Sequence, residues 1–264
     1  MALATPILRT ALVLLIGSRF LVQSQPALAD PTATDAGFAA YAQRSFQAAQ
    51  AQYRAAPGEA TAALKFARAC FELAEFATNK TERALLADQG ITACQQALAR
   101  EPKSGPGHYY LGLNLGQLAR TKGLSALKLV PQMQQEFKRA LGLDAQLDWA
   151  GPDRNLGLLY FNAPAIGSIG SRVKARAHFT HAVELAPTYP GNRLNLIEAY
   201  LQWRELSNAK SELTALEAAW PIARTNLVGE AWAPSWADWE ARLKKLTKRI
   251  ETTSKSIEAP RTRP

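Results

Sequence analysis

From residue 37 to residue 254, apolar residues recur every three to four positions, the spacing of one face of an α-helix. Alanine and leucine dominate and β-branched residues are sparse, so the composition favours helices over sheets. Proline and glycine interrupt the pattern, and helices are expected to end there, at 57–58, 102–107, 151–152, 163–170, 187–191 and Pro221. The pattern predicts an all-α protein with helices over 37–55, 59–77, 81–100, 107–121, 125–142, 152–161, 171–186, 191–204, 207–219 and 235–254.

The predicted helices come in pairs, and the pairs repeat. One pair keeps small and large apolar residues in a fixed order before its final proline: Leu156, Gly157, Tyr160, Ala175, Phe179, Ala182 and Pro187. The segments 66–102, 108–140 and 193–221 keep the same order less completely. Small residues of this kind suit the point where two helices cross, and large ones fill the space on either side. One hairpin cannot cover its own apolar face, so the hairpins are expected to stack.

Over residues 60–221 this order resembles the tetratricopeptide repeat (TPR) family. The resemblance implies a right-handed superhelical solenoid of antiparallel helix hairpins, here with an N-terminal helix and a C-terminal capping helix. The chain departs from the family at the opening tryptophan of each repeat, which is replaced by Phe66, His108, Asp153 and Arg193. The first three units also have longer interhelical loops, which resemble those of divergent bacterial periplasmic repeat proteins such as the repeat component associated with TRAP transporters.

The first 29 residues predict export. Arg9 precedes a short apolar run over 11–17, and Ala27-Leu28-Ala29 has the small-x-small form that signal peptidase cleaves. The run is too short to span a bilayer, and Arg19 interrupts it, so a membrane anchor is not expected. The mature protein would begin at Asp30 and function in the periplasm or outside the cell.

The net charge of +9 is concentrated at the C-terminus, where residues 241–264 contain eight basic residues against Glu251 and Glu258. The repeats are therefore nearly neutral, and nucleic-acid binding is not expected. Apolar residues recur at helical spacing through the same segment, which predicts an amphipathic capping helix: Trp236, Trp239, Leu243, Leu246 and Ile250. A contact of 241–264 with an anionic membrane or cell-wall surface is compatible with capping.

These features divide the chain into five parts. They are a signal peptide (1–29), a polar lead and N-terminal helix (30–58), about four TPR-like hairpins (59–222), a linker with the capping helix (223–256) and a basic disordered tail (257–264).

Cys70 and Cys94 fall on facing sides of the first hairpin. In an oxidising compartment a disulfide between them would close a loop of about 25 residues and stabilise the fold by roughly 3 kcal/mol. The alternative is two small apolar core residues, since helix axes at the usual spacing often hold the Cα atoms too far apart for a bridge. Both remain open at this point.

Three other features suggest chemistry, but each has a simpler interpretation. His178, His181 and Glu184 share a helical spacing that metal ligands also use, yet Phe179 and Ala182 take the core face, which leaves the histidines on the surface. The glycine-rich loop before Ser171 lacks the phosphate-binding lysine, and Ser171 suits a helix N-cap. The sequence has no hydrolase motif. No metal, cofactor or catalytic residue is therefore predicted, and an enzyme is not expected.

The concave face of the predicted solenoid is the expected binding surface. Repeat register places ten candidate binding residues there: Glu75, Tyr109, Leu113, Gln117, Arg154, Leu158, Phe161, Asn162, Glu198 and Gln202. Aromatic, amide and single charged groups along a groove suit an extended peptide or a helix. The sequence therefore predicts an exported scaffold that binds a protein or peptide partner.

Two other functions fit the same pattern. The protein could serve a TRAP-type transport system and contact a solute-binding protein or a small ligand, or it could be a cell-envelope enzyme or cell-wall factor that holds a saccharide or peptide strand. An aromatic-lined hole through the repeats would favour the transport function, and a flat open groove with charged anchors would favour peptide docking.

Overall fold

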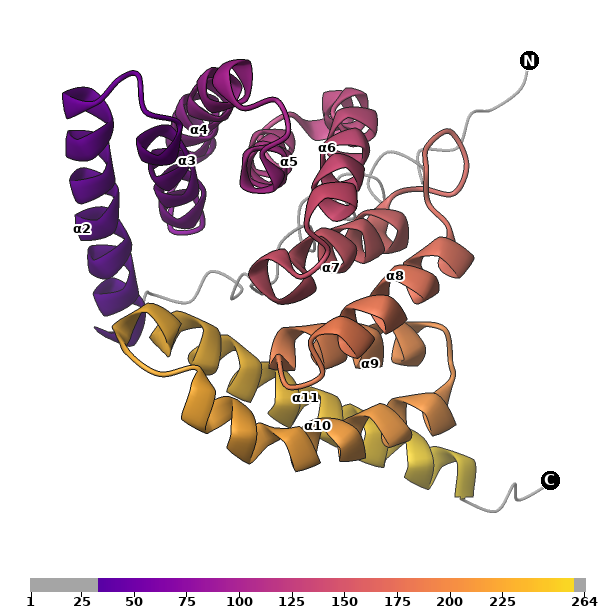
Figure 1. Ribbon diagram of the computed structural model, residues 1–264. Helices are drawn as coiled ribbons and strands as arrows, with labels where there is room; N and C mark the ends of the chain where they lie inside the picture. The colour runs from indigo at the N-terminus through magenta and orange to yellow at the C-terminus, as the bar shows by residue number, and fades with distance from the viewer. Residues whose placement is uncertain (1–32, 259–264) are drawn as a thin grey trace.

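The computed structural model describes residues 33–258, and all regular secondary structure in that range is helical (Figure 1). The all-α prediction is confirmed. In chain order the elements are α2 (Ala33–Ala55), α3 (Ala60–Ala74), α4 (Lys80–Arg100), α5 (Gly105–Ala119), the 3₁₀-helix η1 (Gly123–Lys128), α6 (Val130–Leu143), α7 (Leu147–Asn162), α8 (Arg172–Leu185), α9 (Pro190–Gln202), α10 (Leu206–Asn226), the 3₁₀-helix η2 (Glu230–Trp232) and α11 (Ala233–Glu258).

Four hairpins, α3–α4, α5–α6, α7–α8 and α9–α10, follow one another around a curve, and α2 packs on the first (Figure 1). Polar N-caps define where several of their helices begin. The side chain of Asn79 accepts a hydrogen bond from the Glu82 amide (2.9 Å), and Ser171 accepts one from the Lys174 amide (3.3 Å). These bonds satisfy amide groups that have no partner within the helix. The predicted capping role of Ser171 is confirmed.

Glycine lies at the predicted crossing points within the hairpins. A Cβ atom on Gly157 would lie 2.5 Å from the Phe179 ring, and one on Gly112 would lie 2.6 Å from the Phe137 ring. Both distances are shorter than any van der Waals contact, so only glycine fits without displacing the ring. The spacing of small and large residues in the sequence therefore reflects direct contact between paired helices.

At the third repeat, a buried carboxylate replaces the missing tryptophan. Asp153 on α7 is only 1% exposed, and its two oxygens accept hydrogen bonds from Nδ1 of His178 and of His181 on α8, each at 2.7 Å. The His178 ring also stacks on Tyr160. His181 is exposed, as the sequence predicts, and His178 is half-buried. Both also contact Asp153 across the hairpin, a role that the sequence analysis does not assign to them. A buried carboxylate needs such partners, because an unpaired charge is costly to bury.

Two other repeats make the same exchange of an aromatic ring for a polar pair. His108 hydrogen-bonds to Glu136 through Nδ1 (2.5 Å), and Arg193 forms an ion pair with Glu212. Each pair joins the two helices of one hairpin. Only Phe66 keeps an aromatic ring at this position, and it packs against rings of α2. The departures from the family pattern are thus local substitutions that preserve the hairpin.

The prediction that the last hairpin ends near Pro221 is wrong. Pro221 lies inside α10, which continues to Asn226 and so crosses the boundary predicted at residue 222. A proline inside a helix removes one hydrogen bond, but packing beyond it favours continuation. Trp220 meets Trp236 edge to face, and Ala223 is 1% exposed. Burial of this extra helical turn offsets the lost bond.

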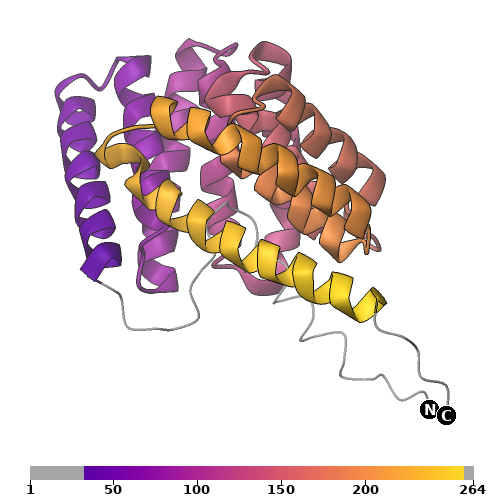
Figure 2. The same cartoon turned by 90° about the horizontal axis from the view of Figure 1, so that it is seen from below.

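Helix α11 closes the curve of hairpins (Figures 1 and 2). Its buried face, which includes Trp239 and Leu246, packs against α9 and α10, as the predicted capping helix requires. Its N-terminal end reaches back to α2, and Arg44 forms an ion pair with Glu230 of η2 at 2.7 Å. The concave side of the solenoid is therefore covered at one point by the C-terminal segment, which the sequence did not predict.

Cys70 and Cys94 are both free, and both are fully buried between α3 and α4. Of the two alternatives, the structure contains the pair of core residues and no disulfide. Burial raises the pKa of Cys70 to about 12 and raises that of Cys94 as well, so both thiols are protonated at neutral pH.

The predicted signal peptide and most of the predicted basic tail lie outside the described residues. Within residues 33–258, no helix has the length and apolar composition needed to cross a membrane.

Candidate functional site

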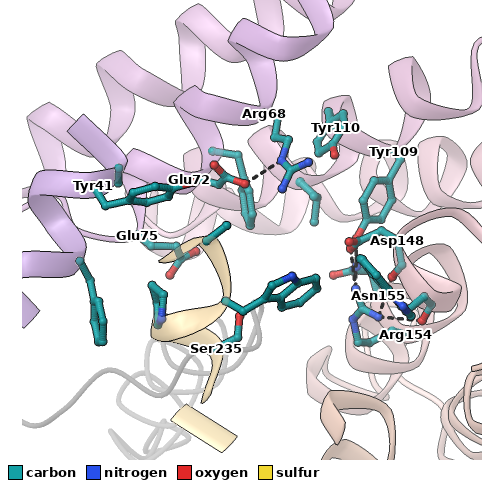
Figure 3. A pocket seen from close by; sticks show the side chains of 18 of the residues that line it. Tyr41, Arg68, Glu72, Glu75, Tyr109, Tyr110, Asp148, Arg154, Asn155 and Ser235 are labelled. Atoms are coloured by element: carbon teal, nitrogen blue, oxygen red, sulfur yellow. Dashed lines mark hydrogen bonds and ion pairs between the residues drawn. The ribbon is translucent and has the colours of Figure 1, made fainter. Parts of the chain in front are cut away.

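A pocket of about 440 Å³ lies on the concave side, between the first helices of the hairpins and the C-terminal segment that crosses them (Figure 3). Its walls come from α2, α3, α5, α7, the residue before α9, η2 and the start of α11. Aromatic rings make up nearly half of the lining residues, and they are those of Phe38, Tyr41, Phe71, Phe76, Tyr109, Tyr110, Trp149, Tyr189, Trp232 and Trp239.

A left-handed turn at the start of α7 forms one side of the pocket. Asp148, Trp149 and Ala150 all have positive φ (51°, 53° and 60°), a conformation that costs about 1–2 kcal/mol for each residue with a Cβ atom. Arg154 stabilises the turn by donating from Nη1 to the carbonyl oxygens of Asp148 (3.1 Å) and Trp149 (3.0 Å). Asn192 donates to the Trp149 carbonyl as well (3.1 Å). The turn directs Asp148 and Trp149 toward the pocket.

Asp148 is the centre of a polar network on this side. Its Oδ2 accepts hydrogen bonds from the Tyr109 hydroxyl (2.5 Å) and from Arg154 Nη2 (2.6 Å), and Figure 3 shows these groups facing one another. Gly151 permits the approach, since a Cβ atom there would lie 2.4 Å from the Tyr109 hydroxyl. Burial, with the nearby charge of Asp148, raises the pKa of Tyr109 well above its ordinary value. Tyr109 is therefore a neutral donor, and Asp148 carries the negative charge.

A second polar group lies on the α3 side of the pocket. Arg68 donates from Nε to Glu72 (2.7 Å), and both side chains are partly exposed. Burial raises the pKa of the adjacent Tyr110 to about 12. Glu75, one turn further along, forms an ion pair with Arg120 (3.0 Å) behind the pocket wall. Every charged residue that lines the pocket therefore has an oppositely charged partner.

Trp149 joins this polar side to an aromatic cluster. Its indole stacks on Tyr189 (5.6 Å between ring centroids) and meets Trp232 edge to face (4.8 Å). Tyr189 in turn contacts Trp239 of α11 (5.2 Å). Trp149 is still 41% exposed, unusually high for so large an apolar side chain inside a cluster. The cluster thus presents ring surface to the pocket as well as connecting α7, α9 and α11.

Four of the ten predicted binding residues line the pocket: Glu75, Tyr109, Leu113 and Arg154. These four lie on the side of the solenoid to which the repeat register assigns them. Their roles differ from the prediction, because Tyr109 and Arg154 are buried and position Asp148.

The other six predicted residues lie elsewhere. Gln117, Leu158 and Asn162 are buried between helices, and Gln117 donates its side-chain hydrogen bond to Glu75. Phe161 packs against Phe179 and Trp203. The two remaining residues are Glu198, which pairs with Arg242 of α11 (3.2 Å), and Gln202, which is exposed away from the pocket.

Arg242 also corrects the view of the basic C-terminal segment. It is 7% exposed and hydrogen-bonds to Asn195, so it belongs to the interface between α11 and α9. Lys244, Lys245, Lys248 and Arg249 remain on the exposed face of α11.

Sequence reasoning missed the contributions of α2, η2 and α11, and the left-handed turn. The available signal was the run of tryptophans at 232, 236 and 239, together with Trp149 just before Gly151-Pro152. The sequence analysis assigns Trp236 and Trp239 to the capping helix and gives Trp149 and Trp232 no role. No group of three or more His, Cys, Asp or Glu residues within 33–258 is arranged to hold a metal ion.

Comparison with known proteins places the fold. The chain resembles the solved structure of TTC0263, a thermophilic TPR protein of Thermus thermophilus, with a TM-score of 0.58 at 19% identity, covering 80% of this chain and 95% of that one. The fold is TPR-like. The yeast Tom70 structure aligns with a TM-score of 0.29 at 12% identity, covering 94% of this chain and 73% of Tom70. No curated protein matches the chain.

A family model described as Regulator of microtubule dynamics protein 1-3 matches residues 32–150, less than half of the chain. The matched region contains the α2, α3 and α5 walls of the pocket and the left-handed turn. It ends before Arg154, Tyr189 and α11, which complete the pocket.

Proposed function

We propose that the protein is a non-catalytic binding module that holds a short segment of a partner protein in its aromatic pocket. The observation that carries this proposal is the pocket itself, about 440 Å³ of concave, ring-lined space inside a TPR-like solenoid. That volume lies at the lower end of the range of about 300–1,000 Å³ typical of ligand pockets. It accommodates a few side chains and is too small for a whole helix.

The closure by α11 limits what can bind. Because η2 and the start of α11 contact α2, they cross the concave side and interrupt the groove that an extended peptide would follow. The partner would therefore insert one to three residues, and aromatic or aliphatic side chains suit the walls. The proposed binding site is therefore smaller than the predicted ten-residue groove and lies around Tyr110, Asp148 and Trp232.

Binding without catalysis is supported by the state of the charged groups. Asp148 and Glu75 each have a guanidinium partner, and Tyr109 and Tyr110 near Asp148 are neutral because their pKa values are raised. A general acid–base pair needs two groups that exchange protons near neutral pH. The paired carboxylates and raised tyrosine pKa values instead suit a fixed recognition surface.

A free small organic molecule is the second candidate ligand. The specific observation in its favour is the aromatic lining of a concave pocket, which suits a small organic molecule better than a flat docking groove would. In this case the protein would act as the accessory component of a transport system and pass the molecule to or from a solute-binding partner.

A matched pair of variants tests the proposed site. Ser235 lies at the pocket edge on α11, whereas Ser211 is exposed on α10 and does not line the pocket. Ser235→Trp should fill the pocket, and Ser211→Trp adds the same side chain elsewhere. Ligands would come from a displayed library of seven-residue peptides and from a small-molecule library, and their affinities would be measured by calorimetry.

We expect the selected ligands to bind wild type and Ser211→Trp equally and to lose at least tenfold in affinity for Ser235→Trp. Peptide ligands support the first candidate, and small molecules alone support the second. Equal binding to all three proteins would show that recognition occurs outside the pocket, and the proposal would be wrong.

We also propose that the protein is exported, on the basis of the cleavable signal pattern in residues 1–29. Expression of the full chain in a bacterial host, with mass measurement of the mature protein, tests this proposal. Recovery from the periplasm with Asp30 at the N-terminus supports export, and an intact chain retained in the cytoplasm contradicts it.

A further inference from the structure

We infer that the pocket selects a ligand with an ammonium group, which binds beside Asp148 between the surrounding aromatic rings. This inference rests on the proposed function, because it names the chemistry of the ligand at the same site. An amine on a free organic molecule and a lysine side chain of a partner peptide share this chemistry.

The first argument is the unused edge of the Asp148 carboxylate. Both hydrogen bonds that it accepts from the described residues, those from Tyr109 and Arg154, reach Oδ2. Oδ1 accepts none from the described part of the chain, although the side chain is only 33% exposed and lines the pocket. A carboxylate oxygen at the edge of an apolar pocket is a strong acceptor for a charged donor.

Arg154 is not the donor for Asp148 Oδ1. Its guanidinium is engaged with the Asp148 and Trp149 carbonyls, Asp148 Oδ2 and Asn192, and it lies over the Tyr189 ring (4.8 Å to the centroid). These contacts hold the left-handed turn in place. Arg154 therefore fixes the position of Asp148, and its guanidinium is already engaged by these contacts.

Each of the three carboxylates that line the pocket, those of Glu72, Glu75 and Asp148, pairs with a guanidinium. Charge alone therefore does not distinguish them. Asp148 differs in its position, because two hydrogen bonds fix its carboxylate in the pocket wall next to the partly exposed Trp149 ring.

The second argument is the aromatic surface around that oxygen. Trp149 is the neighbour of Asp148 and is partly exposed, and Tyr110 and Trp232 line the same pocket. The faces of aromatic rings attract cations, most strongly for tryptophan and when water is excluded. A carboxylate oxygen beside several ring faces is a combination that favours an ammonium group over a neutral or anionic group of the same size.

The backbone supports the same conclusion. Three consecutive non-glycine residues in the left-handed region are rare, and such strain concentrates at functional sites. Without this turn, Asp148 would not meet Tyr109 and Arg154 in the pocket wall. The strained turn therefore serves to place this one carboxylate.

The test uses three probes with the same ring: phenethylamine, 2-phenylethanol and 3-phenylpropionate. Quenching of the pocket tryptophans measures binding of each at neutral pH to the full mature chain. The key variant is Asp148→Asn, since asparagine tolerates positive φ well and keeps the side-chain oxygen that accepts from Tyr109 and Arg154. Glu251→Gln, on the exposed face of α11, removes one charge elsewhere.

We expect phenethylamine to bind at least tenfold more tightly than the other two probes. Asp148→Asn should remove this preference and leave 2-phenylethanol binding unchanged, and Glu251→Gln should behave as wild type. Circular dichroism of each variant confirms that it is folded. The peptide Ac-Ala-Phe-Lys-Ala-NH₂ is compared with the same peptide carrying Gln in place of Lys. Tighter binding of the lysine peptide identifies a lysine side chain as the source of the ammonium group, and binding of phenethylamine alone identifies a free amine.

Two outcomes contradict this inference, and they are distinguishable. If the alcohol or the acid binds as well as the amine, or if Asp148→Asn keeps the preference, the pocket binds ligands but does not select a cation. If none of the probes or peptides binds, the cation inference falls. If a library ligand still loses affinity for Ser235→Trp in that case, the proposed function stands without the cation inference.

Discussion

Single atoms decide how closely the paired helices approach. Gly157 faces the Phe179 ring at a distance that leaves no room for a Cβ atom, while Gly142 on the exposed side of α6 has no neighbour within 4 Å. Gly157→Ala should therefore lower the free energy of unfolding by about 1–3 kcal/mol through overpacking. Gly142→Ala should raise it by roughly 0.5–1 kcal/mol, because alanine favours the helix.

Urea denaturation of both variants checks this prediction. If Gly157→Ala is as stable as Gly142→Ala, then Phe179 moves aside without cost and the hairpin crossing is not tightly packed. Both variants replace glycine with alanine, so a difference in their stability reports the packing around each site.

The cysteines provide a second prediction at the residue scale. Burial raises the pKa of Cys70 to about 12, and it raises that of Cys94 too. At about pH 8 neither thiol should react with Ellman's reagent in the folded protein, since the thiolate is the reactive form. After unfolding in guanidinium chloride both thiols should react. Two unreactive sulfurs in the unfolded protein would instead reveal a disulfide.

At the scale of an element, α9 is followed by Arg204, a non-glycine residue in the left-handed conformation. Arg204 has φ 61°, and the next amide, that of Glu205, bonds to the Tyr200 carbonyl (2.8 Å), which ends the helix. Glycine adopts this conformation without the Cβ penalty. Arg204→Gly should therefore raise the free energy of unfolding by about 1 kcal/mol.

Lys245→Gly is the matched control for the Arg204 variant. Lys245 is exposed inside α11, where glycine should destabilise by about 1 kcal/mol. Thermal unfolding of both variants should shift in opposite directions. A shift in the same direction would mean that the left-handed end of α9 is not maintained in solution.

Glu205 links the α9–α10 connection to α8 and makes this contact sensitive to acid. Its hydrogen bonds with Arg176, Asn208 and Arg172 lower its pKa from 4.5 to about 2. Because the folded pKa is below the unfolded one, the stabilisation is complete above about pH 4.5 and is lost as the pH falls toward 2. Glu205→Gln should flatten the dependence of stability on pH in that window, and an unchanged slope would contradict the role of Glu205.

At the scale of the whole molecule, the hairpins were predictable and their closure was not. Helical spacing, Pro/Gly breaks and the pairing of Gly157 with Phe179 are local signals, and they located most of the helices. Closure brings together Arg44 and Glu230, which are 186 residues apart, and involves tryptophans whose spacing also fits a simple cap. No local pattern encodes which distant helix such a segment meets.

The pocket was only partly predictable for the same reason. Repeat register identified Tyr109 and Arg154 because they lie on regular helices. It could not identify Asp148 and Trp149, since their positive φ values occur without glycine and depend on hydrogen bonds from Arg154 and Asn192. The sequence read that segment as a break between helices, which hid the residues that shape the site.

The crystal structure of the protein with its tightest-binding library ligand tests the central claim most directly. The account predicts that ligand density lies between Tyr110, Trp149 and Trp232, in contact with Asp148, inside the solenoid closed by α11. Density on the outer surface, for example in the shallow hollow beside Leu98, Leu111 and Leu143, with the aromatic pocket empty, would contradict it.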